Sequence, residues 1–535
     1  MRRLTITVAQ LNWYVGAIES NAARMLAVMQ QQPSTVDLLL FSELALTGYP
    51  PEDLLFCDDF HRRCQQQLQQ LAAATQQVAL LVGHPWLVEG RLFNAVSLFW
   101  KGECLIRYYK QCLPNCGVFD ELRYFTPGSN NGLIDFKGYR LGLLICEDLW
   151  EEAPLEALTA AGAELIVSIH ASPYDRYKPR QRRRLLARQA RQSARPIIYV
   201  NQVGGQDELL FDGQSLVYTA QGECCYRFCQ FKEQIATLCF QEQQFTAGPP
   251  ASRALSLTAQ CYQALVLALR DYVTKNGFRR VLLGLSGGID SALTLAIAVD
   301  ALGSEQVQPL FLPSPYTSAL SGQVARQQAA TLSVNLLELP ITPVMQAFTQ
   351  QLQPYIAHDK TGSVTQQNIQ ARCRGTLLMA LANEQNALLL TTGNKSELAV
   401  GYMTLYGDMA GAFAVLKDVL KTRVYQLAHY RNQLSSVIPL AVLERLPTAE
   451  LAPNQCDQDS LPPYPILDAL LRCYIEQNQS PNALIAAGFA ETLVRQVVRF
   501  VDNSEYKRRQ APLGPRVTSR CFGKDRRYPV TYSWA

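Results

Sequence analysis

The sequence predicts an α/β protein in two halves, and two observations carry that prediction. Short runs rich in Val, Ile and Leu, each about the length of a strand, alternate with longer stretches of helical patterning. This alternation occurs twice along the 535 residues, a length that is too great for one ordinary core. We therefore expect two α/β domains, each built around a buried sheet.

The expected elements follow the chain in two series. The first series contains the predicted strands Asp37–Leu40, Val78–Val82, Leu141–Ile145, Leu165–Ile169 and Ile197–Val200. The second contains the predicted strands Val281–Leu285, Val307–Leu312 and Leu388–Leu390 and the helices Ala292–Leu302 and Gly375–Asn383. Between the series, Thr246–Ser252 is small and proline-containing, as linkers often are. We place the boundary near residue 250 and expect domains at 1–248 and 258–535.

Composition excludes several classes of protein. The net charge of +4 is small for this length and does not indicate a nucleic-acid partner. No run of eighteen apolar residues suggests a membrane span. The fifteen cysteines contain no CxxC pair, the five histidines form no zinc pattern, and the start of the chain looks like a strand rather than a signal peptide. We expect a cytoplasmic protein with reduced thiols.

A glycine turn in the second half has the form of a phosphate-binding loop. In Val281–Val299, a buried strand runs into Ser286-Gly287-Gly288, and a helix follows from about Asp290. Free N–H groups at such a helix start attract an anion, and Ser286 and Ser291 can add hydroxyl donors. A carboxylate beside a phosphate requires a cation between them, for which Mg²⁺ is the natural choice. The loop is not a Walker sequence. The alternative is a plain glycine turn.

A second run, Leu388–Gly411, also ends a strand in polar residues. Glu397 is a suitable second magnesium ligand, because two carboxylates hold a cation that one holds poorly. Local chemistry alone allows an alternative, a capped helix start at Ser396 and Glu397.

The first half offers the residues for thiol chemistry on an amide. Glu43 and Cys146 each follow an apolar strand, whose end is a rigid platform for a catalytic group, and Lys110 lies between them in the chain. Cys146 would attack the amide carbon, while Glu43 takes the thiol proton and returns a proton to the leaving ammonia. Lys110 would stabilise the oxyanion and depress the pKa of the thiol. The alternatives are a buried structural cysteine and ordinary surface charges.

One basic stretch calls for a separate interpretation. Arg176–Arg195 is predicted as a helix with its arginines on a solvated or inter-subunit face. An RNA-binding strip is the alternative, and no interleaved aromatic residues support it.

Several segments together resemble the NAD synthetase family over residues 260–535. They are the glycine loop, which is similar to the pyrophosphatase loop of ATP enzymes, Leu388–Gly411, Asn368–Gly375, Leu416–Thr422 and Glu505–Pro512. The resemblance implies a Rossmann-like ATP-pyrophosphatase α/β domain with a parallel sheet. It implies ATP contacts from Gly284, Leu285, Ser286, Gly287, Gly288, Ile289, Asp290, Ser291 and Thr392. It also implies deamido-NAD contacts from Asn368, Arg372, Glu397, Asp408, Lys421 and Lys507, and Mg²⁺ ligation by Asp290 and Glu397. The alternative for Lys507–Arg509 is a solvated tail.

The first half is similar to the nitrilase, or carbon–nitrogen hydrolase, family over residues 3–245. Phe119–Phe125 and Asn201–Gly213 carry this likeness beside the three catalytic candidates. It implies a nitrilase-type α-β-β-α sandwich with a Glu–Lys–Cys triad at Glu43, Lys110 and Cys146. It further implies that glutamine contacts positions 116, 172 and 178, which here are Cys116, Ser172 and Lys178.

Four positions depart from the family patterns. Cys116 stands where these glutaminases usually have tyrosine, and His170 stands where asparagine is usual, so both changes bear on glutamine affinity. Ala452 and Gln367 replace a common arginine and a common glutamate. Nothing in the sequence explains the last two.

The two resemblances together imply a ligase that uses glutamine as its amide donor. ATP would activate deamido-NAD as an acyl-adenylate, and ammonia from glutamine would displace AMP, giving NAD, pyrophosphate and glutamate. The resemblance also implies an internal ammonia passage and a homo-oligomer, with synthetase halves paired as dimers and fused enzymes often assembled as octamers. The alternatives are another ATP-pyrophosphatase amidotransferase, an ammonia-dependent synthetase whose first half is only a scaffold, and a non-catalytic nucleotide sensor.

Overall fold

The computed structural model describes residues 2–248, 252, 254–355, 363–453 and 455–532. The chain divides into two compact units, Met1–Leu255 and Ser256–Ala535. The segment Thr246–Ser252, expected to be a linker, lies partly outside the described residues, and its first two residues belong to the last strand of unit 1. No helix of the described chain has the length and apolar character that a membrane crossing requires.

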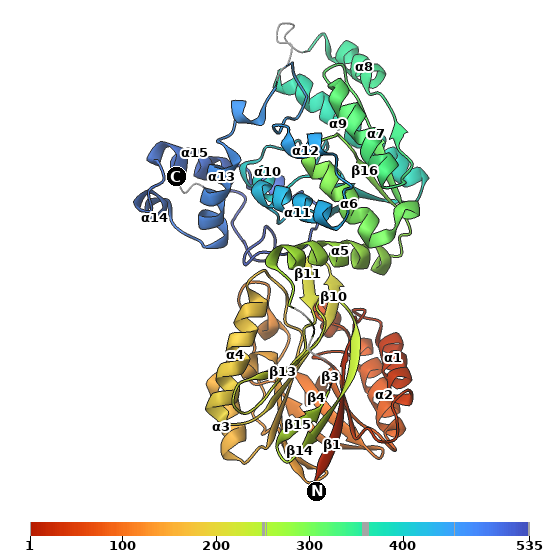
Figure 1. Ribbon diagram of the computed structural model, residues 1–535, viewed down its shortest axis with the longest axis vertical. Helices are drawn as coiled ribbons and strands as arrows, with labels where there is room; N and C mark the ends of the chain where they lie inside the picture. The colour runs from red at the N-terminus through yellow and green to blue at the C-terminus, as the bar shows by residue number, and fades with distance from the viewer. Residues whose placement is uncertain (1, 249–251, 253, 356–362, 454, 533–535) are drawn as a thin grey trace. The chain divides into compact units, whose positions relative to one another are not determined.

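Unit 1 is a four-layer α-β-β-α sandwich (Figure 1). Two helices cover each outer face, namely α1 (Ile18–Gln30), α2 (Asp58–Ala74), α3 (Glu152–Ala160) and α4 (Lys178–Ser193). One sheet has seven strands in the order β15 (Gln244–Ala247), β14 (Gln234–Gln241), β1 (Arg3–Gln10), β2 (Leu38–Leu40), β3 (Ala79–Val88), β4 (Arg91–Trp100) and β5 (Glu103–Tyr109). The expected sandwich is confirmed.

The second sheet of unit 1 has six strands. Their order is β13 (Cys224–Arg227), β12 (Leu216–Tyr218), β9 (Ile197–Asn201), β8 (Leu165–His170), β7 (Tyr139–Ile145) and β6 (Leu133–Phe136). The central strands β7, β8 and β9 are parallel and buried on both faces, which explains their unbroken apolar sequences. A separate hairpin joins β10 (Val203–Gln206) to β11 (Leu209–Asp212).

Unit 2 is built around a five-stranded parallel sheet. The strand order is β18 (Leu337–Glu338), β17 (Val307–Phe311), β16 (Val281–Gly284), β19 (Leu388–Thr391) and β20 (Phe413–Ala414). The order reverses between β16 and β19, and such a switch point leaves a crevice at the carboxyl ends of the strands. The expected parallel α/β domain is confirmed.

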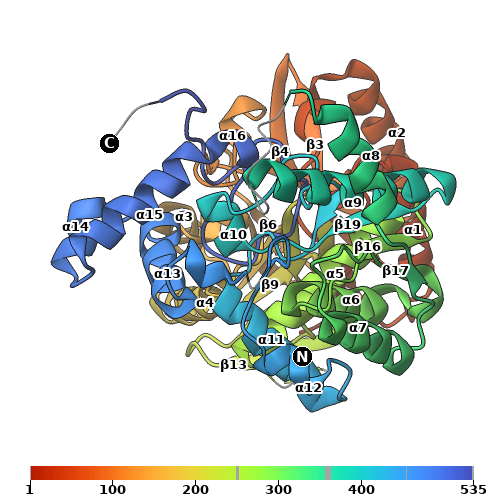
Figure 2. The same ribbon diagram turned by 90° about the horizontal axis from the view of Figure 1, so that it is seen from above.

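Helices lie on both faces of this sheet, with α8 and α9 on the opposite side from α5, α6 and α7 (Figure 2). The longer ones are α5 (Leu257–Lys275), α6 (Ile289–Leu302), α7 (Ala319–Thr331), α8 (Thr342–Leu352), α9 (Val364–Glu384) and α11 (Lys421–Leu434). The others are α10 (Lys395–Val400), α12 (Leu440–Glu444), α13 (Tyr464–Leu471), α14 (Pro481–Ala486), α15 (Glu491–Asn503) and α16 (Glu505–Arg508).

Helix α9 is much longer than the sequence indicated. The apolar pattern predicted only Gly375–Asn383, whereas Ser363 accepts a hydrogen bond from the Gln366 N–H and starts the helix near residue 364. The first half of α9 carries mostly polar residues, so it lacks the periodicity that marks a buried helix face.

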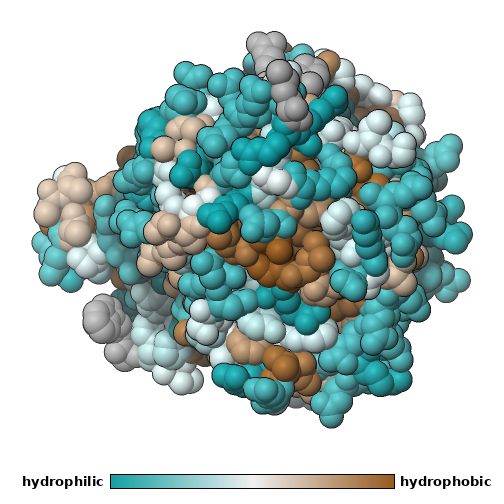
Figure 3. Space-filling view, turned by 90° about the horizontal axis from the view of Figure 1, so that it is seen from below, coloured by the Kyte–Doolittle hydropathy of each residue, from teal (hydrophilic) through white to brown (hydrophobic). Residues whose placement is uncertain are grey.

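The apolar side chains gather in separate cores inside each unit. One core lies between the two sheets of unit 1, and another lies between its larger sheet and helices α1 and α2. The face seen from below is mostly hydrophilic, with separate smaller hydrophobic areas (Figure 3). All fifteen cysteines are free thiols.

Candidate active sites

Cys146 lies at a strained turn where β7 ends. Its φ of 46° is in the left-handed region, which costs a non-glycine residue about 1–3 kcal/mol and recurs at functional sites. A short 3₁₀ helix, Cys146–Leu149, begins at this residue and turns the chain away from the sheet. The side chain is buried, and the strand behind it fixes its position.

Lys110 joins two buried carboxylates beside this turn. Its ammonium donates to Glu43 Oε1 at 2.7 Å and to Glu121 Oε1 and Oε2 at 2.9 and 2.8 Å. The Asn94 amide donates to Glu43 Oε1 at 2.8 Å, and the Ala171 N–H donates to Glu43 Oε2 at 2.8 Å. Glu43 and Lys110 are therefore held in one geometry by partners that surround them.

Glu121 is a member of this cluster that the sequence interpretation missed. It accepts a hydrogen bond from the Tyr49 hydroxyl at 2.9 Å as well as the two from Lys110. The only signal was its place in the segment Phe119–Phe125, which had been noted for its likeness to the family and not for its chemistry.

The electrostatics of the cluster favour a neutral thiol in the resting site. Burial and Glu43 raise the pKa of Cys146 well above its ordinary value, and Lys110 offsets only part of that shift. Lys110 thus lowers the pKa of the thiol, as expected, but the net shift is upward, because desolvation and Glu43 outweigh one lysine that two carboxylates already neutralise. Burial lowers the pKa of Lys110, but Glu121 and Glu43 outweigh it, so the net shift is upward. Burial raises the pKa of Glu121 to about 7, against the opposing effect of Lys110.

Asp148 braces the two segments that carry the nucleophile and the lysine. One carboxylate oxygen accepts from the backbone N–H groups of Gln111 and Cys112 at 2.9 and 2.8 Å. The other accepts from the N–H of Ile145 at 3.1 Å and from the Tyr108 hydroxyl at 2.9 Å. This buried carboxylate thus ties the chain just after Lys110 to the chain just before Cys146. Its position two residues from the cysteine was the only sequence signal.

The residues expected to contact glutamine lie in different surroundings. Ser172 is buried, and its N–H donates to Asn201 Oδ1 at 3.0 Å. The Lys178 ammonium lies 3.9 Å from the centroid of the Trp150 ring, and burial lowers its pKa while the nearby Cys146 opposes that shift. Cys116 is exposed in the loop that follows Lys110. Lys178 thus lies near Cys146, whereas Cys116 is at the surface.

His170 is buried inside unit 1. Its Nε2 lies 2.7 Å from the Ser168 hydroxyl, and its ring centroid is 3.9 Å from that of Tyr199. Burial lowers its pKa well below the ordinary value, with the charge of Lys110 adding to the shift. His170 is therefore neutral at physiological pH, like the asparagine that the family usually has there.

The basic helix α4 corrects one detail of the sequence interpretation. Most of its arginines are exposed or half-buried, as expected for a solvated face. Arg182 is instead fully buried and forms an ion pair with the fully buried Asp212. A long-range carboxylate partner accounts for this burial, and helical spacing gives no sign of such a partner.

In unit 2, the glycine loop forms a closed turn between β16 and α6. The Ser286 N–H donates to Ser291 Oγ at 3.2 Å, the two hydroxyl oxygens lie 3.1 Å apart, and the Gly288 N–H donates to Ser286 Oγ at 3.2 Å. Gly287 has a φ of 82°, and a Cβ there would lie 2.6 Å from the backbone oxygen of Ser321. A glycine is therefore required at this position, and hydrogen bonds within the turn hold its shape.

Two carboxylates and one lysine form a cluster beside the loop. The Lys421 ammonium donates to Asp290 Oδ2 and, at 3.2 Å, to Glu397 Oε1. The Asn394 amide donates to Asp290 Oδ1 at 2.9 Å, and Asn394 also caps the helix that carries Glu397. Asp290 and Glu397 thus both contact the Lys421 ammonium, although 107 positions separate the two carboxylates in the chain.

Burial and the neighbouring Asp290 charge favour the protonated form of Glu397. They raise its pKa to about 8, against the opposing effect of Lys421. Burial would lower the pKa of Lys421, but Asp290 and Glu397 outweigh it and raise the pKa. Two carboxylates with one lysine carry a net negative charge, so the cluster retains either a proton or a cation.

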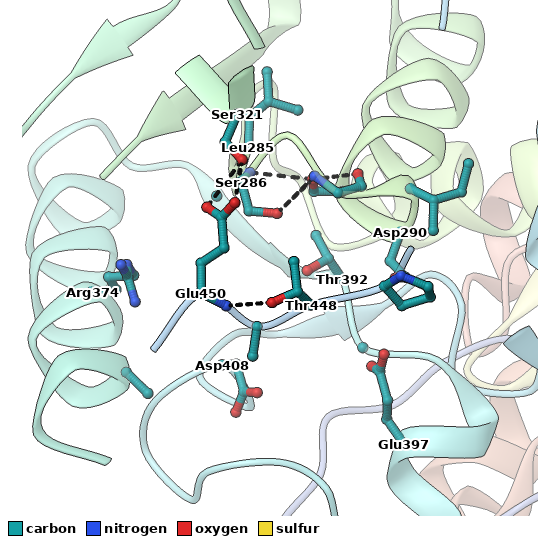
Figure 4. Close-up of a pocket in the computed structure, with 18 of the residues that line it drawn as sticks. Leu285, Ser286, Asp290, Ser321, Arg374, Thr392, Glu397, Asp408, Thr448 and Glu450 are labelled. Carbon is teal, nitrogen blue, oxygen red and sulfur yellow. Dashed lines mark hydrogen bonds between the residues drawn. The ribbon is translucent and has the colours of Figure 1, made fainter. Parts of the chain in front are cut away.

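A cavity opens at the carboxyl ends of the strands and contains the loop and the cluster (Figure 4). Asp290 and Glu397 lie on one side of it and Arg374 on the other, with Thr392 between them (Figure 4). Of the expected site residues, the cavity is lined by Gly284, Leu285, Ser286, Gly288, Ile289, Asp290, Ser291, Thr392, Glu397, Asp408 and Lys421. Burial raises the pKa of Asp408 to about 6.

Gly287 lies within the glycine loop itself, and the other expected residues gather around a segment beside the cavity. Lys507 donates to the carbonyl oxygens of Gly401 and Met403 at 2.6 and 2.7 Å, and Arg372 Nε donates to Leu405 O at 3.2 Å. Asn368 Oδ1 accepts a hydrogen bond from the Thr404 hydroxyl at 2.8 Å. These three side chains hold the 401–405 segment in place.

The alternative of a solvated basic tail fails for this C-terminal region. Arg508 is buried, and it bonds Glu505 Oε2 at 2.8 Å and the Ala399 carbonyl at 2.7 Å. Only Arg509 of the three basic residues is exposed.

Two further features of the cavity were not expected. Arg374 is half-buried in its wall, donates Nε to the Leu312 carbonyl at 3.0 Å, and has a pKa that burial lowers to about 10. Glu450 reaches the start of α7, where it accepts from Ser321 Oγ at 2.9 Å and pairs with Arg445 at 2.9 Å (Figure 4). Arg374 lies only two residues beyond the expected Arg372, so the motif was found but the residue facing the cavity was not.

The two sites together indicate a class of enzyme. Unit 1 contains a buried thiol beside a lysine and two carboxylates, and unit 2 contains a glycine loop beside a lysine and two carboxylates. A chain with both is of the amidotransferase class, in which one site frees ammonia from an amide and the other uses it.

Comparison with known proteins gives the family. Residues 5–246 match the carbon–nitrogen hydrolase family, and residues 261–511 match the NAD synthase family. The chain is 45% identical to the glutamine-dependent NAD(+) synthetase of Acinetobacter baylyi, covering 100% of this chain and 99% of that one. It is 42% identical to the enzyme of that name from Aquifex aeolicus, covering 99% of both chains. The chain belongs to the glutamine-dependent NAD(+) synthetase family.

Solved structures agree with this assignment. The structure of the Acinetobacter baumannii glutamine-dependent NAD+ synthetase in complex with ADP has a TM-score of 0.81 to this chain. The two are 42% identical, and the match covers 99% of this chain and 98% of that one.

Proposed function

We propose that this chain is a glutamine-hydrolysing NAD(+) synthetase, which amidates deamido-NAD at the expense of ATP. The products are NAD, AMP, pyrophosphate and glutamate. One observation carries the proposal, namely that both reactive sets are assembled in a single chain. Residues 1–248 would form the glutaminase domain and residues 258–535 the synthetase domain.

In the synthetase site, the nicotinate carboxylate of deamido-NAD attacks the α-phosphate of ATP and pyrophosphate leaves. The loop from Ser286 to Ser291 and the start of α6 hold the departing pyrophosphate through hydroxyl and backbone N–H donors. Lys421 adds a fixed positive charge beside it. Ammonia then attacks the acyl carbon of the adenylate and displaces AMP.

The substrates would be bound by the residues that line or flank the cavity. Gly284 to Ser291 and Thr392 would contact ATP. Asn368, Arg372, Asp408 and Lys507 would bind deamido-NAD together with Glu397 and Lys421, because they hold or border the 401–408 segment next to the cavity.

The residues present fit a magnesium ion. Asp290 and Glu397 supply carboxylate oxygens on the same cavity as the phosphate loop, which matches the way Mg²⁺ binds few carboxylates together with substrate phosphates. Among the described residues, no group of three or more His, Cys, Asp or Glu could hold a metal by itself. When bound, the ion would neutralise phosphate charge during adenylation. For the ion to bind, Glu397 must lose its proton, and its contact with Lys421 must be replaced by one with the ion.

In the glutaminase site, Cys146 Sγ attacks the side-chain amide carbon of glutamine while Glu43 takes the thiol proton. Transfer to Glu43 accompanies attack, because the resting thiol is neutral. Lys110, fixed by Glu121, stabilises the oxyanion. The proton passes from Glu43 to the leaving ammonia, and water then hydrolyses the thioester to release glutamate. Ser172, Lys178 and Cys116 are the proposed glutamine contacts.

Replacing the nucleophile tests this assignment directly. Cys146→Ala removes the attacking atom, so glutamine-driven NAD formation falls to background, whereas synthesis from an ammonium salt continues at about the wild-type rate. NAD formation from deamido-NAD and ATP is measured with each nitrogen donor. Cys64→Ala, another buried cysteine of unit 1, is the matched control. Equal loss with both donors would refute the role of Cys146.

The same experiment distinguishes an active glutaminase half from one that is only a scaffold. An ammonia-dependent synthetase with an inert first half would form no NAD from glutamine even as the wild-type chain. The assembled cluster of Cys146, Glu43 and Lys110 favours the active form.

Assembly and location are also part of the proposal. We expect a homo-oligomer that pairs synthetase halves as dimers and can extend to an octamer, which light scattering of the purified chain would measure. A cytoplasmic location is supported by the fifteen free thiols, because such thiols persist in reducing compartments.

A further inference from the structure

A C-terminal segment, Pro512–Arg526, lies beyond the residues that match the NAD synthase family, yet it packs against the synthetase site. The family match ends at residue 511. The Ala414 N–H donates to the Leu513 carbonyl at 2.7 Å, so the segment adds to the edge of the parallel sheet at β20. Further along, it contacts the segment that joins β20 to α11.

Asp418 in that joining segment binds the C-terminal segment through both carboxylate oxygens. Oδ2 accepts from the N–H groups of Val517 and Thr518 at 2.8 and 2.7 Å. The Thr518 hydroxyl contacts Oδ1 and Oδ2, at 2.9 Å each. All three residues are buried, so these bonds are shielded from water.

Lys395 completes the contact from the other side. Its wholly buried ammonium pairs with Asp418 Oδ1 at 2.7 Å and with Glu476 Oε1 at 2.9 Å. It also donates to Thr518 Oγ1 at 2.8 Å and to the Arg520 carbonyl at 3.0 Å. Thr518 is therefore the point at which the C-terminal segment meets both Lys395 and Asp418.

Lys395 belongs to the element that carries the cation cluster. It is the first residue of α10, between Asn394, which holds Asp290, and Glu397. Its backbone N–H donates to the Val419 carbonyl at 2.9 Å, and the Lys421 N–H donates to the Ser396 hydroxyl at 2.9 Å. A shift of Lys395 would move Glu397 and Lys421 together.

We propose that Thr518 is a positioning residue for the cation site, acting through Lys395 and Asp418 to set the places of Glu397 and Lys421. The C-terminal segment is then a working part of the synthetase site, although it lies outside the family match. The inference rests on the proposed function only in assigning a divalent cation to this cluster. Groups that support metal ligands from behind commonly alter metal affinity when they are replaced.

The test replaces the hydroxyl while keeping the shape of the side chain. Thr518→Val leaves the backbone contacts of Asp418 and the ion pairs of Lys395 in place, but it removes the hydroxyl by which the C-terminal segment contacts both residues. Ser519→Ala is the matched control, since the exposed Ser519 hydroxyl makes a long contact with the Glu476 carbonyl, at 3.4 Å, and that contact involves neither Asp418 nor Lys395. Thr518→Ser restores the hydroxyl and serves as the rescue.

Two measurements are made on the full chain. Mn²⁺ binding with α,β-methylene ATP present is followed by electron paramagnetic resonance, which reports affinity without turnover. The Mg²⁺ concentration for half-maximal ammonia-driven NAD formation gives the second value. For Thr518→Val we expect both to weaken by about tenfold, with a smaller change in the maximal rate. Ser519→Ala and Thr518→Ser should match the wild type.

Several results would overturn the proposal. One is a Thr518→Val chain that melts earlier but binds Mn²⁺ as the wild type does, since that shows a role in stability alone. If Thr518→Val does not fold, Thr518→Ala takes its place, and failure of both to fold would likewise assign the residue to folding alone. Failure of the proposed function would look different, because the wild-type chain itself would form no NAD.

Discussion

The two units each place a buried lysine between two carboxylates, and the clusters differ in what surrounds them. Lys110 with Glu43 and Glu121 is sealed, with side chains 0%, 1% and 6% exposed. Lys421 with Asp290 and Glu397 lines a cavity, and those two carboxylates are 17% and 16% exposed. The sealed cluster is complete without a ligand. The open one has carboxylates that a cation from solvent can reach.

This difference matches the chemistry proposed for each site. Proton transfer to and from a thiol needs a base and a cation fixed before glutamine arrives, and water would weaken both. A triphosphate site instead has to admit a large, charged ligand and its counter-ion. A lysine with two carboxylates would therefore serve as a preformed catalytic group in unit 1 and as a replaceable ion pair in unit 2.

The largest expected effect comes from removing the lysine of the sealed cluster. Lys110→Met leaves Glu43 and Glu121 as adjacent buried carboxylates, which should lower the free energy of unfolding of unit 1 by about 3–5 kcal/mol. Glutamine-driven NAD formation should fall on the order of 10³-fold, because the oxyanion loses its cation. Denaturant unfolding and the two-donor assay measure these effects. Lys137→Met, which breaks a surface ion pair with Asp37, is the control and should cost about 0–1 kcal/mol.

The matching change in the open cluster should act mainly on rate. Lys421→Met should lower NAD formation from either nitrogen donor on the order of 10²-fold. It should reduce the free energy of unfolding by only about 1–3 kcal/mol, since the carboxylates can be hydrated. Added Mg²⁺ should recover part of that stability, whereas it should recover none in Lys110→Met. Identical responses of the two variants to Mg²⁺ would contradict the distinction between sealed and open clusters.

The smallest expected effect is the number of protons released when Mg²⁺ binds to the open cluster. The pKa of Glu397 is raised to about 8 from its ordinary value of 4.5, so the metal-free fold favours the protonated carboxyl. That contribution to stability is full below about pH 4.5 and is lost as the pH rises through 8. Mg²⁺ needs the carboxylate, so its binding should release about one proton at pH 6.5 and none at pH 9.5.

Calorimetry in two buffers of different protonation enthalpy measures this release. Glu397→Gln, which cannot titrate, is the control and should release none at either pH. Equal proton release by the wild type at both pH values would show that Glu397 is not the group displaced.

Much of the fold and many site candidates could be predicted because their signals are local. The α/β class, the sandwich and the parallel sheet are confirmed, and so is the family. The glycine loop consists of a strand end, a turn and a helix start within a few consecutive residues, so its sequence alone predicts an anion-binding loop. The assigned roles of individual residues, such as Asn368 and Ser172, stay predictions.

The sequence by itself determined which chemical groups are present and which short segments carry them. Only the tertiary structure decided how those groups pair. Lys421 meets Asp290 across 131 positions, and the contact of Lys395 with Thr518 spans 123. The buried Arg182 likewise pairs with Asp212, 30 positions away, and the buried Arg508 donates to the Ala399 carbonyl, 109 positions away, and local periodicity reveals neither contact. Burial then sets the pKa of Cys146 and Glu397, since desolvation depends on every element packed around a group and not on its neighbours in the chain.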